Sequence, residues 1–153
     1  MLYSAAMKNA LFLAVFCGFL ALANARAAQT AVATHKTEAE LTAALKQSTP
    51  DMLTSPVSVE GHHRINIVRR TKGAGATAHE GAAELHHIIE GSGTFVTGGT
   101  LVRPAGGGAA TIEGGESKRV KKGDVLVVPA GMPHWYKDLD GTLTYLEVRW
   151  DEK

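Results

Sequence analysis

Hydrophobic and polar residues alternate with a period of two through most of the chain after residue 57. The alternating runs are short and rich in Val, Ile, Thr and aromatic residues, a composition typical of β-strands. Turns that contain glycine separate the runs, and no helical periodicity lies between them, which favours an antiparallel sandwich or barrel. The predicted strands are residues 64–70, 84–90, 94–102, 124–129, 134–139 and 142–150.

A different periodicity comes before these strands, in residues 37–48 (TEAELTAALKQS). Thr37 is followed three residues later by Glu40, the pair that forms a capping box at the start of a helix. We expect Pro50 and Pro56 to end this segment, because proline interrupts regular structure. The short predicted helix has one apolar face, formed by Leu41, Ala44 and Leu45.

The N-terminus has the pattern of an export signal. Lys8 is followed by an apolar run, residues 11–22, and then by small residues that allow cleavage after Ala25 or Ala27. The run is shorter than the roughly 20 apolar residues that a membrane-spanning helix needs. We therefore expect residues 1–27 to be a signal peptide. The mature protein is then periplasmic or secreted, with no membrane attachment once the signal is removed.

The predicted division of the chain is a signal peptide (1–27), a leader with the short helix (28–56) and one barrel (57–153). The single cysteine, Cys17, lies in the signal peptide, so His, Asp or Glu must hold any metal in the mature chain. Cleavage removes two basic residues and no acidic ones, so the formal charge falls from +1 to −1. The chain has no basic patch with interleaved aromatic residues, so we expect no nucleic-acid partner.

Two segments carry the most chemically active residues. In GDVLVVPAGMPHW (123–135), a Gly-Asp turn leads into a buried strand, Pro129 ends that strand and Gly131 permits a sharp reversal. His134 then begins the next strand with a fixed orientation. In HEGAAELHHIIEG (79–91), histidines and glutamates precede a glycine turn. This second segment is either part of a metal site or a polar strand rich in histidine.

The spacing within residues 123–134 resembles the second motif of the cupin superfamily at every position. Residues 79–91 resemble the first cupin motif, in which two histidines and a glutamate precede a strand that ends in a glycine turn. The resemblance covers about residues 64–150. It implies an all-β fold, an antiparallel double-stranded β-helix or jelly-roll barrel, here with a short N-terminal helix.

The first motif departs from the family's pattern, which has His-x-His ahead of the glutamate. Glu84 lies seven residues before Gly91, as the family's glutamate does, and only His79 precedes it. Counted back from Glu84, His79 takes the second histidine's place and Thr77 the first. Counted from the upstream side, His79 takes the first place and Gly81 the second. We favour the first alignment, because the distance from Glu84 to Gly91 anchors it.

The missing imidazole has a candidate replacement on the same strand. Glu84 and His86 share one face of residues 84–90, because side chains alternate along a strand. If Glu84 points into the barrel, as the resemblance implies, His86 points in beside it and either ligates a metal or lines the cavity. The predicted ligands are therefore His79, His86 and His134, with Glu84 as a fourth ligand or as a partner that orients an imidazole.

Tyr136 lies two residues after His134 on the same predicted strand face. Its phenol could donate a proton or an electron beside the metal, or it could simply line the barrel. Tyr136 and Glu84 are thus the catalytic candidates. We expect His87 to face the other side of the sheet, and the histidines near the strand entrance and in the leader to take no part: His62, His63 and His35.

The expected cofactor is one divalent transition metal ion per chain. Three imidazoles around an open coordination position favour copper, with iron, zinc or manganese as alternatives. The first functional interpretation is an exported copper or iron oxidoreductase that acts on an extracellular carbohydrate or phenolic. The alternatives are a non-redox isomerase or lyase in which the metal acts as a Lewis acid, and a module that binds a sugar or another small molecule without catalysis.

Two further expectations concern recognition and assembly. The sequence shows no obvious cluster of Arg or Lys that would clamp a phosphate group. We also expect a homodimer, because an open barrel leaves exposed strand edges that can pair with a second copy.

Overall fold

The computed structural model describes residues 32–46 and 51–152, and the predicted signal peptide, residues 1–27 with Cys17, lies outside these ranges. The helix and the strands belong to one unit that begins at residue 34. No helix within the described ranges is long and apolar enough to cross a membrane.

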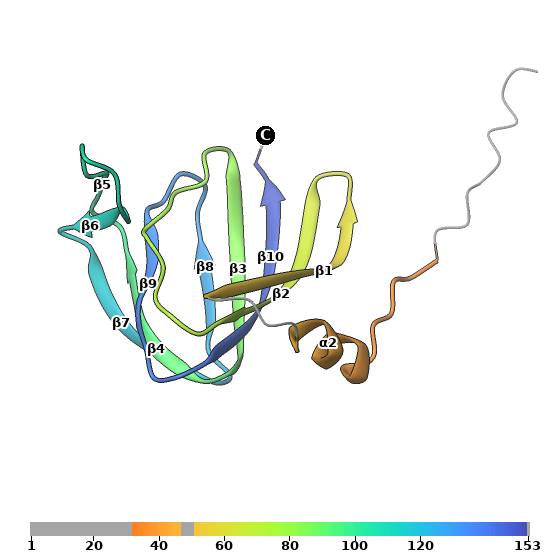
Figure 1. Ribbon diagram of the computed structural model, residues 1–153. Coiled ribbons are helices and arrows are strands. Elements are labelled where there is room, and N and C mark those ends of the chain that lie inside the picture. The colour runs from red at the N-terminus through yellow and green to blue at the C-terminus, as the bar shows by residue number, and fades with distance from the viewer. Residues whose placement is uncertain (1–31, 47–50, 153) are drawn as a thin grey trace, which may run out of the picture. The chain divides into compact units, whose positions relative to one another are not determined.

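The strands are antiparallel and form two facing sheets and a small ribbon (Figure 1). The larger sheet has the order β1 (Met52–Glu60), β2 (His63–Arg70), β10 (Leu143–Asp151), β3 (Ala82–Glu90) and β8 (Val125–Val128). The smaller sheet has the order β7 (Glu116–Lys121), β4 (Ser92–Thr97) and β9 (His134–Leu139), while β5 (Thr100–Val102) pairs with β6 (Thr111–Glu113). The predicted all-β jelly-roll class is confirmed.

The apolar core lies between the two sheets, which both contribute to it. Ile88 of β3 is 0% exposed, and Phe95 of β4 belongs to the same buried cluster. Burial of such side chains is the dominant favourable term in folding. The members of the cluster are Val68, Ile88, Phe95, Val120, Val128, Tyr136, Leu143 and Tyr145.

The predicted N-terminal helix is α2 (Glu38–Leu45), which contacts β1 and β2. Its capping box is present as the sequence indicates: the amide of Glu40 donates to Thr37 Oγ1 at 3.2 Å, and the amide of Thr37 donates to Glu40 Oε2 at 2.8 Å. The other helical positions are exposed. The predicted apolar face is half-buried and consists of Leu41, Ala44 and Leu45.

The N-terminal strand begins earlier than the alternation suggests, at Met52 rather than residue 57. Pro56, expected to end the preceding segment, lies inside β1, where the pairing register with β2 shifts between Pro56 and Ser58. A proline is tolerated there because β1 is an edge strand and a bulge releases one ladder position. The expectation that Pro56 ends a segment was therefore wrong.

Two further differences lie in the middle of the chain. The predicted strand 94–102 divides into β4 and β5 at Gly98 and Gly99, whose φ angles of 75° and 68° suit glycine. Residues 104–118, which lie outside the predicted strands, contain β6 and the start of β7. Strand β7 was not predicted, because only Val120 of its residues is buried and the strand therefore has no hydrophobic alternation.

Candidate metal centre

Four side chains from three parts of the chain meet on the inner side of the barrel. Glu84 and His86 lie on β3 and are 1% and 2% exposed, as the period-two pattern predicts. His134, at the start of β9, is 5% exposed. His79 lies in the loop before β3 and is half-buried. The structure therefore brings together every residue that the sequence nominates as a ligand.

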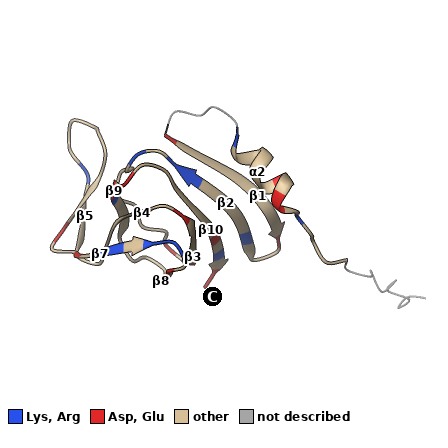
Figure 2. Cartoon of the chain, turned by 90° about the horizontal axis from the view of Figure 1, so that it is seen from below, with Lys and Arg blue, Asp and Glu red and all other residues tan. Residues whose placement is uncertain are grey.

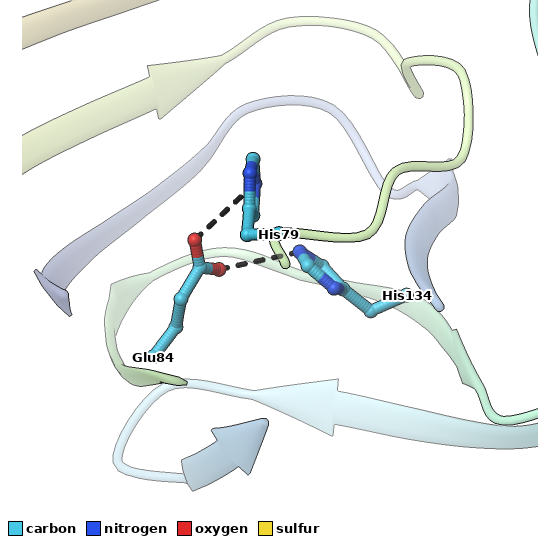
Figure 3. Close-up of side chains that lie close together, drawn as sticks. All are labelled: His79, Glu84 and His134. Atoms are coloured by element: carbon cyan, nitrogen blue, oxygen red, sulfur yellow. Dashed lines mark ion pairs between the residues drawn. The ribbon is translucent and has the colours of Figure 1, made fainter. Parts of the chain in front are cut away.

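The carboxylate of Glu84 is the centre of this cluster, and Figure 3 shows one of its oxygens directed at each of two rings. Oε1 lies 3.3 Å from His79 Nε2, and Oε2 lies 3.2 Å from His134 Nε2. His86 Nε2 is 3.1 Å from Oε2. Arg149 of β10 adds a guanidinium in direct contact with Oε1.

Backbone pairing holds the two histidine-bearing segments together. Thr77 and His134 exchange two backbone hydrogen bonds, with N···O distances of 3.0 and 2.8 Å. The amide of Gly131 donates to His79 O at 2.9 Å, and the φ of 71° at Gly131 makes the reversal before His134. The Pro-x-Gly-x-x-His spacing thus places the His134 ring beside His79. Thr77 lines the cavity next to them.

The electrostatics keep Glu84 ionised. Burial by itself raises the pKa of Glu84, but hydrogen bonds from His134 and His86 and the charge of Arg149 outweigh it and hold that pKa well below its usual range. Burial lowers the pKa of His79, although the neighbouring Glu84 opposes the shift. A carboxylate anion and a neutral imidazole are the forms in which these groups bind metals.

Residues 62–142, more than half of the chain, match the family model of the cupins. The chain belongs to the cupin family. No curated protein sequence matches this cupin at a significant level.

Several solved structures share the fold at low sequence identity. A Klebsiella pneumoniae protein with a double-stranded β-helix domain has a TM-score of 0.58 and 10% identity, covering 80% of this chain and 93% of its own. A Ralstonia eutropha protein, named provisionally as a mannose-6-phosphate isomerase, has a TM-score of 0.56 and 16% identity, with 78% and 99% covered. A Thermotoga maritima protein, named by inference as an oxalate decarboxylase, has a TM-score of 0.51 and 18% identity, and the match covers 65% of this chain and 80% of its own.

The chemistry of the cluster fits a metal ion. His134 Nδ1 lies 3.0 Å from Met132 O, and a carbonyl only accepts, so Nδ1 carries the hydrogen. Its Nε2 faces a second acceptor, Glu84 Oε2, at 3.2 Å, and either a proton or a cation between these two atoms satisfies both of them. His79 Nε2 accepts from Arg149 at 3.1 Å, so it presents a lone pair.

The oxygen Glu84 Oε1 supports the same conclusion. It is buried and within ion-pair range of Arg149 and His79, yet it accepts no hydrogen bond of good geometry. One ligand atom from each of His79, Glu84 and His134 lies within 4.8 Å of the others, close enough to share one ion. A second group, Glu84, His86 and Glu147, meets the same criterion among the described residues.

His86 connects Glu84 to the predicted phenol. Tyr136 Oη lies 3.0 Å from His86 Nδ1, and the two rings stack with centroids 5.7 Å apart. Glu84 Oε2 only accepts, so His86 Nε2 carries the hydrogen between them and Nδ1 is the atom that accepts from the Tyr136 hydroxyl. Burial and the neighbouring Tyr145 raise the pKa of Tyr136, which keeps that hydroxyl protonated. Direct ligation by His86, and the role of Tyr136, stay predictions.

The remaining histidines lie outside the cluster. His87 is exposed, because it points to the opposite face of β3 from His86. His62 is also exposed and lies 3.9 Å from Asp151. The others are exposed too: His35 and His63.

The sequence did not reveal the basic residues around the site. A cavity of about 50 Å³ at the cluster adjoins an outer groove of about 440 Å³, and Arg70, Glu147 and Arg149 line both. Arg64 lines the outer groove only. The sequence shows no obvious phosphate clamp, because these arginines lie far apart along the chain. These residues lie on β2 and β10, and only the pairing register of those strands places them together.

Proposed function

We propose that this cupin is a mononuclear metal enzyme in which His79, Glu84 and His134 hold one divalent transition metal ion per chain. The observation that carries the proposal is the buried, ionised Glu84 carboxylate with two imidazole nitrogens 3.2 and 3.3 Å away. Under this proposal His86 orients Glu84 through their hydrogen bond, or joins as a further ligand.

The donor set bears on which metal is bound. Two histidines and one carboxylate with open positions are typical of non-haem iron(II) enzymes. Three imidazoles, with His86 as the third, would favour copper instead. We therefore place iron(II) first and copper second, with zinc and manganese as alternatives. A redox-active ion at this position would pass electrons from the substrate, which is oxidised, to dioxygen or peroxide, which is reduced.

The side chains around the ion would control protons and substrate position. Tyr136 holds a proton at its hydroxyl and passes a hydrogen bond through His86 to Glu84. We propose Tyr136 and Glu84 as the groups that move a proton during the reaction. The outer groove has a volume typical of small-molecule sites, which is consistent with a carbohydrate or phenolic substrate.

A non-redox enzyme is the second candidate. The solved structures similar to this chain include proteins named as a mannose-6-phosphate isomerase and an oxalate decarboxylase. In that case the metal would act as a Lewis acid on the substrate, and a redox-silent ion would suffice.

Location and assembly follow from separate features. The signal-like pattern of residues 1–27 supports export to the periplasm or beyond. A homodimer is supported by the two open edges of the larger sheet, β1 and β8. Val125 and Val127 of β8 are 56% and 63% exposed, so a second copy could cover them.

The test of the reaction class is metal exchange. The protein is purified without a histidine tag, stripped of metal and loaded separately with iron, copper or zinc. Oxidant consumption is then measured with carbohydrates and phenolics in the presence of oxygen or hydrogen peroxide. We expect turnover with iron or copper and none with zinc. Equal conversion of a substrate by the zinc form would contradict the redox proposal and favour the Lewis-acid alternative.

A further inference from the structure

We propose that the outer groove binds the carboxylate of an anionic small molecule, so the substrate class is an organic acid such as an acidic sugar or an aromatic acid. The inference rests on the proposed function for the reaction that follows, but binding of the acid is a separate property. It narrows a substrate otherwise described only as a carbohydrate or phenolic.

The first observation is a pair of like charges set directly opposite each other. Arg64 of β2 pairs in register with Arg149 of β10, and both side chains line the groove. Side chains at directly opposite positions are close neighbours, and like charges there destabilise the sheet. Figure 2 shows basic residues at both ends of β2. An anion between the two guanidinium groups would relieve the repulsion.

The two arginines differ in how far they are already neutralised. Arg149 contacts Glu84 and lies 3.7 Å from Glu147. Arg64 is exposed and has no acidic partner among the described residues. Glu147 accepts a hydrogen bond from Asn66 at 2.9 Å and forms no ion pair with Arg64 in the described part of the chain. Arg64 is therefore the guanidinium available to a ligand.

Arg70 lies at the other end of β2 from Arg64, also lines the groove and adds a second set of donors. Its Nε donates to Tyr145 Oη at 2.9 Å, and its guanidinium lies over the Tyr136 ring, 5.7 Å from the centroid. Its Nη1 is buried without a hydrogen-bond partner, and so is Arg149 Nε. Buried donors without acceptors are costly, so the groove is set up to receive an acceptor.

The charge balance points the same way. The cavity and the groove together are lined by three guanidinium groups and two carboxylates, which leaves a net formal charge of +1: Arg64, Arg70, Arg149, Glu84 and Glu147. A bound divalent ion would raise it to +3. A planar guanidinium matches a planar carboxylate with two parallel hydrogen bonds, which favours an organic acid over a neutral sugar or phenol.

The test compares acids with neutral molecules of the same shape. Binding to the metal-loaded and the metal-free protein is measured by calorimetry for galacturonate against galactose and for 4-hydroxybenzoate against phenol. Inorganic phosphate is titrated separately and as a competitor. We expect at least one acid to bind about tenfold more tightly than its neutral counterpart, a difference of about 1.4 kcal/mol. We expect phosphate to bind more weakly than that acid.

Variants test whether acid binding depends on the groove or only on the general charge of the protein. Arg64→Gln should reduce acid binding about tenfold, the effect of one charge-assisted hydrogen-bonded pair. Arg64→Lys should keep only part of the affinity, because it retains charge without the planar fork. Lys118→Gln is the control, since Lys118 lies on β7 beside Glu116 and should leave acid binding unchanged.

The outcomes distinguish this proposal from the proposed function. Metal content is measured on each sample, and Arg64→Gln should retain the metal of the wild type. If metal is bound and neither pair shows a preference for the acid, the acid proposal is wrong and the metal enzyme stands. An acid preference that Arg64→Gln leaves intact, or a tighter binding of phosphate, would also overturn it. If the protein takes up no metal under any loading condition and still prefers the acid, the acid proposal stands and the metal-enzyme proposal is wrong.

Discussion

The inner face of the larger sheet has two ends that differ sharply in chemistry although they share strands β2, β10 and β3. At one end the residues are charged and surround the candidate metal centre. Further along, the row that includes Val68 is apolar and belongs to the core, although Arg70 of β2 lies beyond it. From the polar end inward, the paired rows are Arg64–Arg149–Glu84, Asn66–Glu147–His86 and Val68–Tyr145–Ile88.

The comparison shows where this protein gains stability and where it places function. In the apolar row, Val68, Tyr145 and Ile88 are no more than 1% exposed. In the first polar row, Glu84 is equally buried, but Glu84 Oε1 and Arg149 Nε lack hydrogen-bond partners. Buried polar groups without partners destabilise a fold, so the polar end is kept for binding and not for stability.

The largest expected effect is on folding, at the apolar end. Ile88→Ala should lower the free energy of unfolding by about 2–5 kcal/mol, because a fully buried side chain leaves a cavity. Ile89→Ala is the matched control, since Ile89 is 38% exposed on the other face of the same strand, and its cost should be about 1 kcal/mol or less. Urea denaturation measures both. A similar loss of unfolding free energy in the two variants would contradict the claim that the apolar row on the inner face stabilises the fold.

The next effect is on metal binding, at the polar end. Glu84→Gln keeps the side-chain shape but removes the negative charge that two imidazoles face. Metal affinity should fall by at least about 100-fold, because loss of a residue that only orients a metal ligand already lowers affinity by up to about that factor. Competition with a chromogenic chelator measures it. Glu90→Gln, an exposed glutamate on the same strand, should leave affinity unchanged. Equal affinity in Glu84→Gln would exclude this carboxylate as a ligand.

A smaller effect of opposite sign is expected at Arg149. Its guanidinium contacts Glu84 Oε1 and donates to His79 Nε2, two atoms that a metal ion would need. Arg149→Gln should therefore increase metal affinity, by about tenfold or 1.4 kcal/mol. Arg119→Gln, which removes an exposed arginine from β7, is the control for net charge. Weaker metal binding in Arg149→Gln would mean that Arg149 supports the site.

The smallest effect concerns an exposed carboxylate far from the barrel's inner face. Hydrogen bonds from Ser92 and Arg119 hold the pKa of Asp140 below its usual range. Its folded-state pKa is depressed, so its small contribution to stability is present above the unfolded pKa of about 3.9 and is lost as pH falls through the lower folded value. In Ser92→Ala, an NMR titration should show the pKa of Asp140 moving up. An unchanged pKa would exclude the Ser92 bond as its main cause.

The fold and half of the site could be predicted from local patterns. Strand alternation placed Glu84 and His86 on one face, and the motif spacing oriented His134. Arg64 and Arg149 could not be placed, because the sequence does not state which residues pair across β2 and β10. Strand β7 was missed because its exposed polar residues carry no hydrophobic period.

The central claim is that His79, Glu84 and His134 form one metal site, and metal content tests it most directly. The untagged protein is analysed by elemental mass spectrometry alongside His134→Ala and the control His87→Ala, whose side chain is exposed on the outer face of β3. We predict about one transition metal ion per chain in the wild type and in His87→Ala, and almost none in His134→Ala. A wild type that binds no iron, copper, zinc or manganese on incubation, or a His134→Ala variant that retains its metal, would contradict the claim.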